Sequence, residues 1–401
     1  MSYKFSSLFI LVSCALMGFS GWRGYHYFFD KHAPVVYIHG ANQDEYCADE
    51  VHCRLEGSDA YKVADISVWL DGKLLVHKFK INAKQFEYPF AVDTKKLVNG
   101  LHVIKAEAVS GTYNGTRALL QRSFFVDNSP LQAAFLRSDA DYKVLQGRTL
   151  HVQFQVNKDI KAATARALSH SYPCLQEAKN SPIYECFIPI TCEEVPNEYP
   201  LSIEIVDNVG NIVVLENKFQ ILPFQFKKQV LRVDPAKVKE EKEAGIAAQE
   251  LEIELERLAQ QSPQKKLWQG VFYPPIDITA ISTEYGTVRT TQERGRYAHK
   301  AVDVLNTPKS VVWATQDGIV VLKNRYAYSG NTVVIDHGYG ILSLFFHLDT
   351  FADIAVGDII KRGNPLGTLG KTGYASGYHL HWEMRINNIP VDPMQWIKLT
   401  F

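Results

Sequence analysis

Two histidines separated by one residue, His379 and His381, are the side chains in this sequence best placed to do chemistry. On a β-strand, residues i and i+2 point to the same face about 6–7 Å apart, because each residue rises about 3.3 Å. The two imidazoles would therefore stand side by side. Neutral imidazole is a common zinc ligand, and zinc with three protein ligands keeps a position for a water that is nucleophilic near neutral pH. One histidine of the pair could bind a metal ion while its neighbour transfers protons.

A second pair, His299 and Asp303, offers one nitrogen and one oxygen donor, and both donor types suit a borderline divalent ion. A solitary histidine, His347, lies between this pair and the first. Each signal alone is weak, because paired histidines are common on wet strand faces. All five residues, however, follow one another between positions 299 and 381, among glycine-bounded strands. Their conjunction predicts a single metal site.

The segment around these residues, about 272–397, resembles the lysostaphin/LytM-type zinc metallopeptidases. All five positions hold the residue types of the family's motifs, which implies a C-terminal antiparallel β-sheet peptidase domain over residues 263–401. Four stretches carry the resemblance: ISTEYGTVRT, HKAVDVLNTPKSVVWATQDGIVV, GNTVVIDHGYGILSLFFHLD and VGDIIKRGNPLGTLGKTGYASGYHLHWEM.

By this resemblance, His299, Asp303 and His381 are the ligands of one Zn²⁺ ion, and His347 and His379 are the catalytic histidines. The implied reaction is peptide-bond hydrolysis, in which zinc lowers the pKa of its water and a histidine that is not a ligand takes the proton. Which of the two catalytic histidines is the base and which stabilises the oxyanion stays open. The implied substrate is bacterial peptidoglycan, cut at its peptide crosslinks or stem peptides during cell-wall remodelling.

Three positions depart from the family's pattern. Ala301 stands where a glycine is usual, and Phe345 and Phe346 replace a tyrosine and a small residue before the lone histidine, which predicts a groove of different shape. Tyr297 is a candidate for the upstream tyrosine that some members use near the first ligand. His337 matches a recurrent position that is not catalytic, so we interpret it as structural.

Two other functions remain as alternatives. A non-catalytic regulator of this fold would bind and activate a partner cell-wall hydrolase, and divisome proteins would be further partners. Such regulators typically lose metal ligands, whereas this chain keeps every one. A surface adhesin with a vestigial C-terminal domain is the third hypothesis. The intact ligand set favours the enzyme.

Composition narrows the class of protein. A length of 401 residues predicts two to four domains. Lysine plus arginine and aspartate plus glutamate number 43 each, so there is no basic excess to hold a polyanion, and nucleic acid is not an expected partner. An aromatic share of 12% is typical of folded, mainly β domains.

The uncharged stretch between Lys4 and Arg23 is just long enough to span a bilayer, and it indicates export. Three fates compete: a retained signal anchor over residues 1–30, a signal peptide cut near Gly18, and a lipoprotein signal with a lipidated Cys14. We favour the anchor, which would place the other domains in the periplasm on the inner membrane. An interfacial aromatic belt supports it, formed by Trp22, Tyr25, Tyr27, Phe28 and Phe29.

Residues 34 to about 222 show short alternating strand patterns separated by turns. Asp71-Gly72 between two such strands predicts a tight hairpin. The run LSIEIVDNVGNIVVLENKFQIL mirrors the earlier HVIKAEAVSGTYNGTRALLQRSFFVD, a weak internal repeat. We therefore expect two immunoglobulin-like β-sandwiches, 31–128 and 129–226, which serve as spacers or binding surfaces.

Cysteine spacing in an exported protein predicts disulfides. Cys47 with Cys53 and Cys174 with Cys186 are the expected pairs, and Cys192 is left over. We interpret them as structural staples rather than as metal ligands.

A helix is predicted over residues 234–262, where Asp234-Pro235 opens a run of helix-forming residues. Leu251, Leu255 and Leu258 form a narrow apolar stripe, which predicts a linker helix docked on one side. Because the helix directly precedes the peptidase domain, one hypothesis is that it shields the groove as an inhibitory element.

Overall fold

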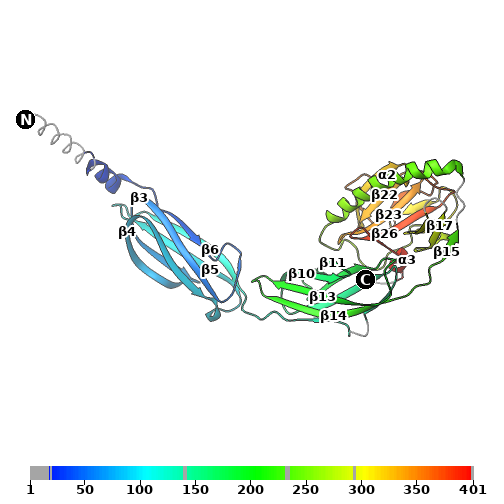
Figure 1. Cartoon of the computed structure of the whole chain (residues 1–401). Helices are drawn as coiled ribbons and strands as arrows, with labels where there is room; N and C mark the ends of the chain where they lie inside the picture. The colour runs from blue at the N-terminus through cyan, green and yellow to red at the C-terminus, as the bar shows by residue number, and fades with distance from the viewer. Residues whose placement is uncertain (1–17, 19, 139–141, 231–234, 292–294, 399–401) are drawn as a thin grey trace, which may run out of the picture. The chain divides into compact units, whose positions relative to one another are not determined.

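The computed structural model describes residues 18, 20–138, 142–230, 235–291 and 295–398. The chain forms two compact units, Met1–Pro130 with Asn208–Gly210, and Leu131–Asp207 with Asn211–Phe401. Strands far outnumber helices in the described part, so the predicted mainly β class is confirmed (Figure 1).

The predicted membrane anchor, residues 1–30, falls mostly outside the described residues, as does Cys14. Residues 20–29 are helical and expose several aromatic side chains. Within the ranges that the structure describes, no helix has both the length and the apolar character needed to cross a bilayer. The anchor therefore stays a prediction.

The smaller unit is built on one six-stranded sheet with the order β1-β3-β5-β6-β2, in which β4 pairs with β3. The predicted hairpin is present, since Asp71 and Gly72 join β3 to β4 with φ angles of 49° and 77°. Such positive angles are what a tight hairpin turn requires. Its elements are β1 (Val35–His39), β2 (Tyr46–Cys47), β3 (Glu50–Leu70), β4 (Lys73–Asp93), the 3-10 helix η1 (Thr94–Lys96), β5 (Gly100–Ser110) and β6 (Arg117–Val126).

The next eight strands begin the larger unit and follow the order β7-β9-β12-β11-β10-β13-β14-β8. Strand β11 pairs with β10 through its first part and with β12 through its last two residues. Apolar side chains from β9 and β12, and from β10, β13 and β14, share one core, which includes Val152 and Ile203. The strands are β7 (Ala133–Phe135), β8 (Lys143–Leu145), β9 (Thr149–Val156), β10 (Ile160–Ala167), β11 (His170–Gln176), β12 (Ile183–Pro189), β13 (Glu198–Asp207) and β14 (Ile212–Leu222). The immunoglobulin-like assignment of residues 31–128 and 129–226 remains a prediction.

The predicted disulfides are not formed, because all five described cysteines are free thiols. Cys174 and Cys186 lie on the neighbouring strands β11 and β12, and Cys47 and Cys53 lie in the core of the smaller unit. Each is buried, where a thiol packs as a small apolar group. Burial raises the pKa of the Cys53 thiol to about 11, which keeps it protonated.

The C-terminal part, here called the C-terminal sheet region, is built on an eight-stranded sheet with the order β16-β19-β26-β23-β22-β21-β24, in which β27 pairs with β26. Two smaller sheets, β15-β17-β18 and β20-β25, accompany it. The strands are β15 (Lys228–Val230), β16 (Ala280–Thr283), β17 (Val288–Thr291), β18 (Gly295–Ala298), β19 (Val302–Leu305), β20 (Val311–Trp313), β21 (Gly318–Tyr326), β22 (Gly330–Asp336), β23 (Ile341–Leu348), β24 (Ile359–Ile360), β25 (Pro365–Thr368), β26 (Leu380–Ile386) and β27 (Ile389–Val391). The helices are α2 (Pro235–Gln260) and α3 (Pro393–Trp396).

Both faces of the eight-stranded C-terminal sheet are covered, and every residue of β23 is buried. Phe345 belongs to the apolar core on one face, whereas Leu344 and Phe346 belong to the cluster on the other. Alternation of side chains along a strand explains this division. The run ILSLFFHL is mostly apolar, interrupted only by Ser343 and His347, which is typical of a strand buried on both faces.

Helix α2 covers the second face, within the stretch 234–262 predicted to be helical (Figure 1). Leu251, Leu255 and Leu258 are buried in the same cluster as Leu344 and Phe346. Their helical spacing places them on one stripe, as the sequence predicted. The helix is therefore docked on the sheet through this stripe.

The sheet of β7–β14, here called the second sheet, also packs on the C-terminal sheet region within the larger unit. Phe187 of β12 shares an aromatic cluster with Trp268, Tyr339 and Trp396. Tyr339 donates a hydrogen bond to the carbonyl of Gln176 over 2.8 Å. Large aromatic rings bury much apolar area, so this cluster accounts for the attachment.

Candidate metal centre

The structure brings three of the predicted site residues together. Strands β19 and β26 pair antiparallel with Asp303 directly opposite His381, and His299 precedes β19 by a short turn. One potential ligand atom from each residue lies within 4.8 Å of the others. His299 and Asp303 are buried, and His381 is nearly so. A nitrogen, an oxygen and a second nitrogen thus converge on one point.

The contacts of His299 fit a bound metal ion. Its Nε2 lies 3.0 Å from Asp303 Oδ1, yet this buried nitrogen makes no hydrogen bond. Burial lowers the pKa of His299 to about 4, so the ring is neutral at physiological pH. A neutral, buried imidazole nitrogen without a hydrogen-bond partner is explained by a cation between it and the carboxylate. Histidine and carboxylate donors are those that zinc accepts.

Asp303 is held from two sides. Its Oδ1 faces the two histidines, and its Oδ2 accepts a hydrogen bond of 3.1 Å from an Nη of Arg289. The same Arg289 nitrogen donates to Thr283 Oγ1 over 2.8 Å. Although burial favours a raised pKa, the neighbouring histidines His299 and His381 hold the pKa of Asp303 well below its ordinary value. The carboxylate is therefore charged and fixed in orientation.

His381 is clamped between two carboxylates. Its Nδ1 lies 2.9 Å from Asp303 Oδ1, and its Nε2 lies 2.9 Å from Glu383 Oε1. Burial acts against the charged ring, but the hydrogen bonds to these carboxylates raise the pKa of His381 to about 9. A carboxylate on one nitrogen fixes the ring and leaves the other nitrogen for a metal. His381 Nδ1 is therefore the ligand atom that this geometry supports.

Phe346, one of the departures from the family's pattern, has a defined contact in this site. Its ring stacks on His381 with centroids 5.0 Å apart and planes inclined by 8°. The two residues are opposite each other in the β23–β26 register. The aromatic residue thus supports one flat side of the imidazole.

His347 reaches the site because the backbone leaves regular strand geometry there. The β22–β23 register shifts between Asn331 and Val333, which indicates a β-bulge, and His347 has a φ angle of 63°. Bulges re-aim side chains next to functional sites, and a positive φ is uncommon outside glycine. His347 Nδ1–H donates to the carbonyl of Thr372 over 2.8 Å, so its Nε2 carries no proton in the neutral ring. Burial, together with the charges of His381 and His379, lowers the pKa of His347 to about 3.

His379 lies beside His347, with ring centroids 4.9 Å apart. Its Nδ1–H donates to the carbonyl of Gly377 over 2.9 Å, which leaves Nε2 as an acceptor. This Nε2 lies 3.8 Å from Asp303 Oδ1. Both predicted catalytic histidines therefore stand next to the three candidate ligands, and both are held by backbone carbonyls.

The glycine-rich segment before His379 allows this arrangement. A Cβ on Gly373 would lie 2.3 Å from the backbone nitrogen of Gly330, and one on Gly330 would lie 2.3 Å from the carbonyl oxygen of Thr372. Only glycine permits two backbones to approach so closely. The contact keeps Thr372 in position to accept from His347.

Other candidates from the sequence lie around the site. Tyr297 is on β18 and half-buried, and Ala301 is fully buried directly before β19. His337 is buried outside the ligand group, and its ring nitrogens contact the carbonyl of Asp317 and Ser343 Oγ, each over 2.7 Å. Both contacts hold the His337 ring in the interior, and they support its interpretation as a structural residue.

Three residues that hold the site were not singled out from the sequence: Arg289, Glu383 and Arg385. Glu383 and Arg385 follow His381 at alternate positions on one strand, so the two-residue period of a strand could have identified them. Arg289 lies on another sheet, and no local spacing connects it to Asp303.

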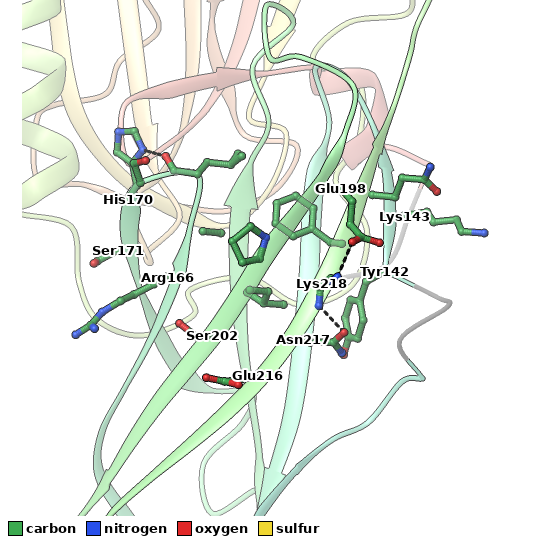
Figure 2. A pocket seen from close by; sticks show the side chains of 17 residues that line it. Tyr142, Lys143, Arg166, His170, Ser171, Glu198, Ser202, Glu216, Asn217 and Lys218 are labelled. Carbon is green, nitrogen blue, oxygen red and sulfur yellow. Dashed lines mark hydrogen bonds and ion pairs between the residues drawn. The ribbon is translucent and has the colours of Figure 1, made fainter.

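A large cavity lies away from the candidate metal centre, on the second sheet (Figure 2). Its volume is about 1030 Å³, and side chains of β10, β11, β13 and β14 line it, among them Arg166, His170, Glu198 and Lys218. None of the five predicted site residues contributes to it.

Comparisons with known proteins agree with the resemblance. Residues 297–393 match a family model described as Peptidase family M23. The chain is 34% identical over 125 residues to DD-carboxypeptidase/endopeptidase Mpg of Neisseria meningitidis, a match that covers 31% of this chain and 29% of that protein. It is 31% identical over 120 residues to peptidoglycan DD-endopeptidase ShyC of Vibrio cholerae, covering 30% and 28%.

The chain thus spans less than a third of the length of these relatives. Among solved structures, the catalytic domain of the antimicrobial peptidase lysostaphin from Staphylococcus simulans is 23% identical, with a TM-score of 0.24, and the match covers 36% of this chain and 97% of that one.

Proposed function

Residues 297–393 carry a peptidase family M23 domain, and from this premise we propose that the chain is a zinc-dependent endopeptidase of bacterial peptidoglycan. It would hydrolyse peptide crosslinks or stem peptides in cell-wall remodelling. The observation that carries the proposal is the convergence of His299, Asp303 and His381 within 4.8 Å, with His347 and His379 beside them.

The ligand set in this proposal is His299 Nε2, an oxygen of Asp303 and His381 Nδ1. When bound, zinc with three protein ligands lowers the pKa of a coordinated water and polarises the carbonyl to be attacked. Glu383 fixes the His381 ring by accepting from Nε2, and Arg289 fixes the Asp303 carboxylate. These contacts pre-organise the donors, so little reorganisation is needed on binding.

Proton transfer is assigned to the two histidines outside the ligand set. Because each donates its Nδ1–H to a backbone carbonyl, His347 and His379 both turn an unprotonated Nε2 toward the site. One of them would accept the proton of the attacking water and return it to the leaving amine. His379 is the more exposed of the two, with 15% of its side chain accessible, and is our candidate for this exchange with solvent.

The names of the relatives support the substrate class. One is named a DD-carboxypeptidase/endopeptidase and another a peptidoglycan DD-endopeptidase. We therefore propose the crosslink between D-alanine and the diamino acid as the bond that is cut. Such a substrate places the protein in the cell envelope, and anchoring on the inner membrane through residues 1–30 is part of the proposal.

Digestion of purified sacculi by the full chain tests the proposal, with product masses as the readout. We expect the parent to release peptides with opened crosslinks and His381→Ala to release none. His379→Ala should keep its metal and lose about 10²–10⁴-fold in rate, the usual contribution of a single acid–base group. His77→Ala, at an exposed position of β4, is the matched control and should behave as the parent.

Identical products from the parent and His381→Ala would remove the proposed function. Metal analysis of the same samples separates the alternative, since a zinc-loaded parent that leaves sacculi intact would support a non-catalytic regulator.

A further inference from the structure

Helix α2 lies on the face of the C-terminal sheet that carries the candidate ligand His381. Side chains at alternate positions of β26 share a face, so His381, Glu383 and Arg385 point to the same side. Figure 1 shows α2 lying across this sheet. Side chains of the helix can therefore reach the partners of His381, although the two segments are far apart in the sequence.

A chain of ion pairs connects the helix to the ligand. The Glu252 carboxylate of α2 accepts from both Nη atoms of Arg385, over 2.6 and 2.8 Å. Arg385 Nε donates to Glu383 Oε2 over 2.7 Å, and Glu383 Oε1 contacts His381 Nε2 over 2.9 Å. The forked contact between guanidinium and carboxylate fixes both distance and orientation. Arg385 and Glu383 are 5% and 7% exposed in their side chains, so solvent screens their pairing little.

An apolar path runs from the same helix to the same ligand. Leu251 and Leu255 pack in one cluster with Phe346, and Phe346 stacks on the His381 ring. The stripe of α2 thus supports the flat side of the imidazole, while Glu252 acts on its edge through Arg385. Two independent sets of contacts lead to one ring.

Loss of Glu252 would alter the environment of a buried cation. Arg385 would keep Glu383 and the contact of its Nη1 with Asn388 Oδ1 at 2.9 Å, but it would lose its forked partner. A buried guanidinium with fewer partners turns more freely, and the carboxylate that it holds becomes less fixed. Glu383 decides which nitrogen of His381 faces the metal site, because it accepts from Nε2.

We propose that Glu252 of α2 is a positioning residue for the metal ligand His381, acting through Arg385 and Glu383. The inference rests on the proposed function, since it assumes that His381 binds zinc. Docking of α2 then contributes to metal affinity, rather than only to the stability of the sheet. The linker helix becomes part of the structure that shapes the site, and shielding of the groove by this helix stays a separate prediction.

The test compares Glu252→Gln with Glu254→Gln in the full chain. Glu254 lies on the same helix and pairs with Arg257 of that helix, so it is a matched control for loss of one carboxylate. Zinc affinity is measured by competition with a chromophoric chelator, and ligand geometry by the d–d absorption of the Co²⁺-loaded protein. Thermal melting of each variant reports the stability of the fold.

We expect Glu252→Gln to weaken zinc binding by about 3–10-fold, less than the about 10–100-fold cost of removing a direct partner of a ligand. Its Co²⁺ spectrum should shift, and Glu254→Gln should match the parent in both measurements. Glu252→Asp, which keeps the charge, should recover part of the loss. Parent-like zinc affinity and an unchanged Co²⁺ spectrum in Glu252→Gln would overturn the inference. A parent that binds zinc but does not digest sacculi would remove the proposed function while leaving this test valid.

Discussion

Among the described residues of the larger unit, a largely buried histidine contacts a glutamate that in turn holds a cation at two places. The first is where the second sheet meets the segment leading into the C-terminal sheet region. There His151 Nε2 lies 2.8 Å from Glu185 Oε2, and Lys266 Nζ donates to Glu185 Oε1 over 3.0 Å. Phe187 stacks on the His151 ring, with centroids 4.8 Å apart.

The second is at the candidate metal centre, with the same kinds of partner. His381 contacts Glu383 over 2.9 Å, Arg385 holds Glu383 over 2.7 Å, and Phe346 stacks on the imidazole at 5.0 Å. In both places the phenylalanine lies opposite the histidine across two paired strands.

The difference lies at the other nitrogen of the histidine. His381 Nδ1 faces Asp303, and His299 completes the only group of potential ligands found among the described residues. His151 belongs to no such group. A histidine, a glutamate and a cation therefore fix a ring, and a second carboxylate with a second histidine makes that fixed ring a candidate metal ligand. At Glu185 the same arrangement serves attachment, because Lys266 joins the second sheet to the C-terminal sheet region.

The largest effect should follow from removing the group that distinguishes the two places. Asp303→Ala leaves two histidines without the carboxylate between them and leaves Arg289 without its ion-pair partner. We expect loss of bound zinc and a fall in hydrolysis beyond the about 10²–10⁴-fold typical of a single acid–base group. Metal analysis and sacculus digestion check this. A variant that keeps one zinc per chain would show that His299 and His381 suffice.

A matched pair of substitutions tests the comparison directly. Glu383→Gln should weaken zinc binding by about 10–100-fold, because a glutamine holds the His381 ring less firmly than a carboxylate does. Glu185→Gln should leave zinc affinity unchanged, since His151 belongs to no group of potential metal ligands among the described residues. Chelator competition on both variants is the measurement. Equal losses in the two would mean that the second sheet also acts on the metal centre.

The smallest effect concerns stability and its dependence on pH. Burial favours a raised pKa, but the hydrogen bond from His151 and the charge of Lys266 lower the pKa of Glu185 below its ordinary value of 4.5. A lowered pKa means that the charged form stabilises the fold above the pKa of the unfolded chain, and that this stability is lost as pH falls through the folded-state pKa. Glu185→Gln should therefore cost about 1–3 kcal/mol of unfolding free energy at neutral pH.

The same cost should shrink as pH falls from 4.5, the ordinary value, through the lower folded-state pKa of Glu185, because the carboxyl group of the parent is neutral below that pKa. Urea unfolding of parent and variant at neutral and acidic pH measures the difference. A cost that does not change with pH would point to packing of the side chain rather than to its charge.

Much of the site followed from local spacing. The i, i+2 pattern predicted that His379 and His381 share a strand face, and the strand β26 includes His381 while His379 directly precedes it. The apolar stripe of the linker helix was equally visible, because helical periodicity is a local property of the chain. The prediction of disulfides was wrong, because pairing is not a local property of the chain. The spacing of Cys174 and Cys186 says nothing about whether two buried thiols form a bond.

The sequence by itself determined which donors are available and on which faces of their strands they stand, because strand and helix periods depend only on neighbouring residues. Only the tertiary structure decided that Asp303 lies opposite His381, that a bulge with a positive φ turns His347 into the site, and that Glu252 reaches Arg385 from a distant helix. These are matters of register and of contact between remote segments. They are settled by packing of the whole sheet, which no short window of sequence contains.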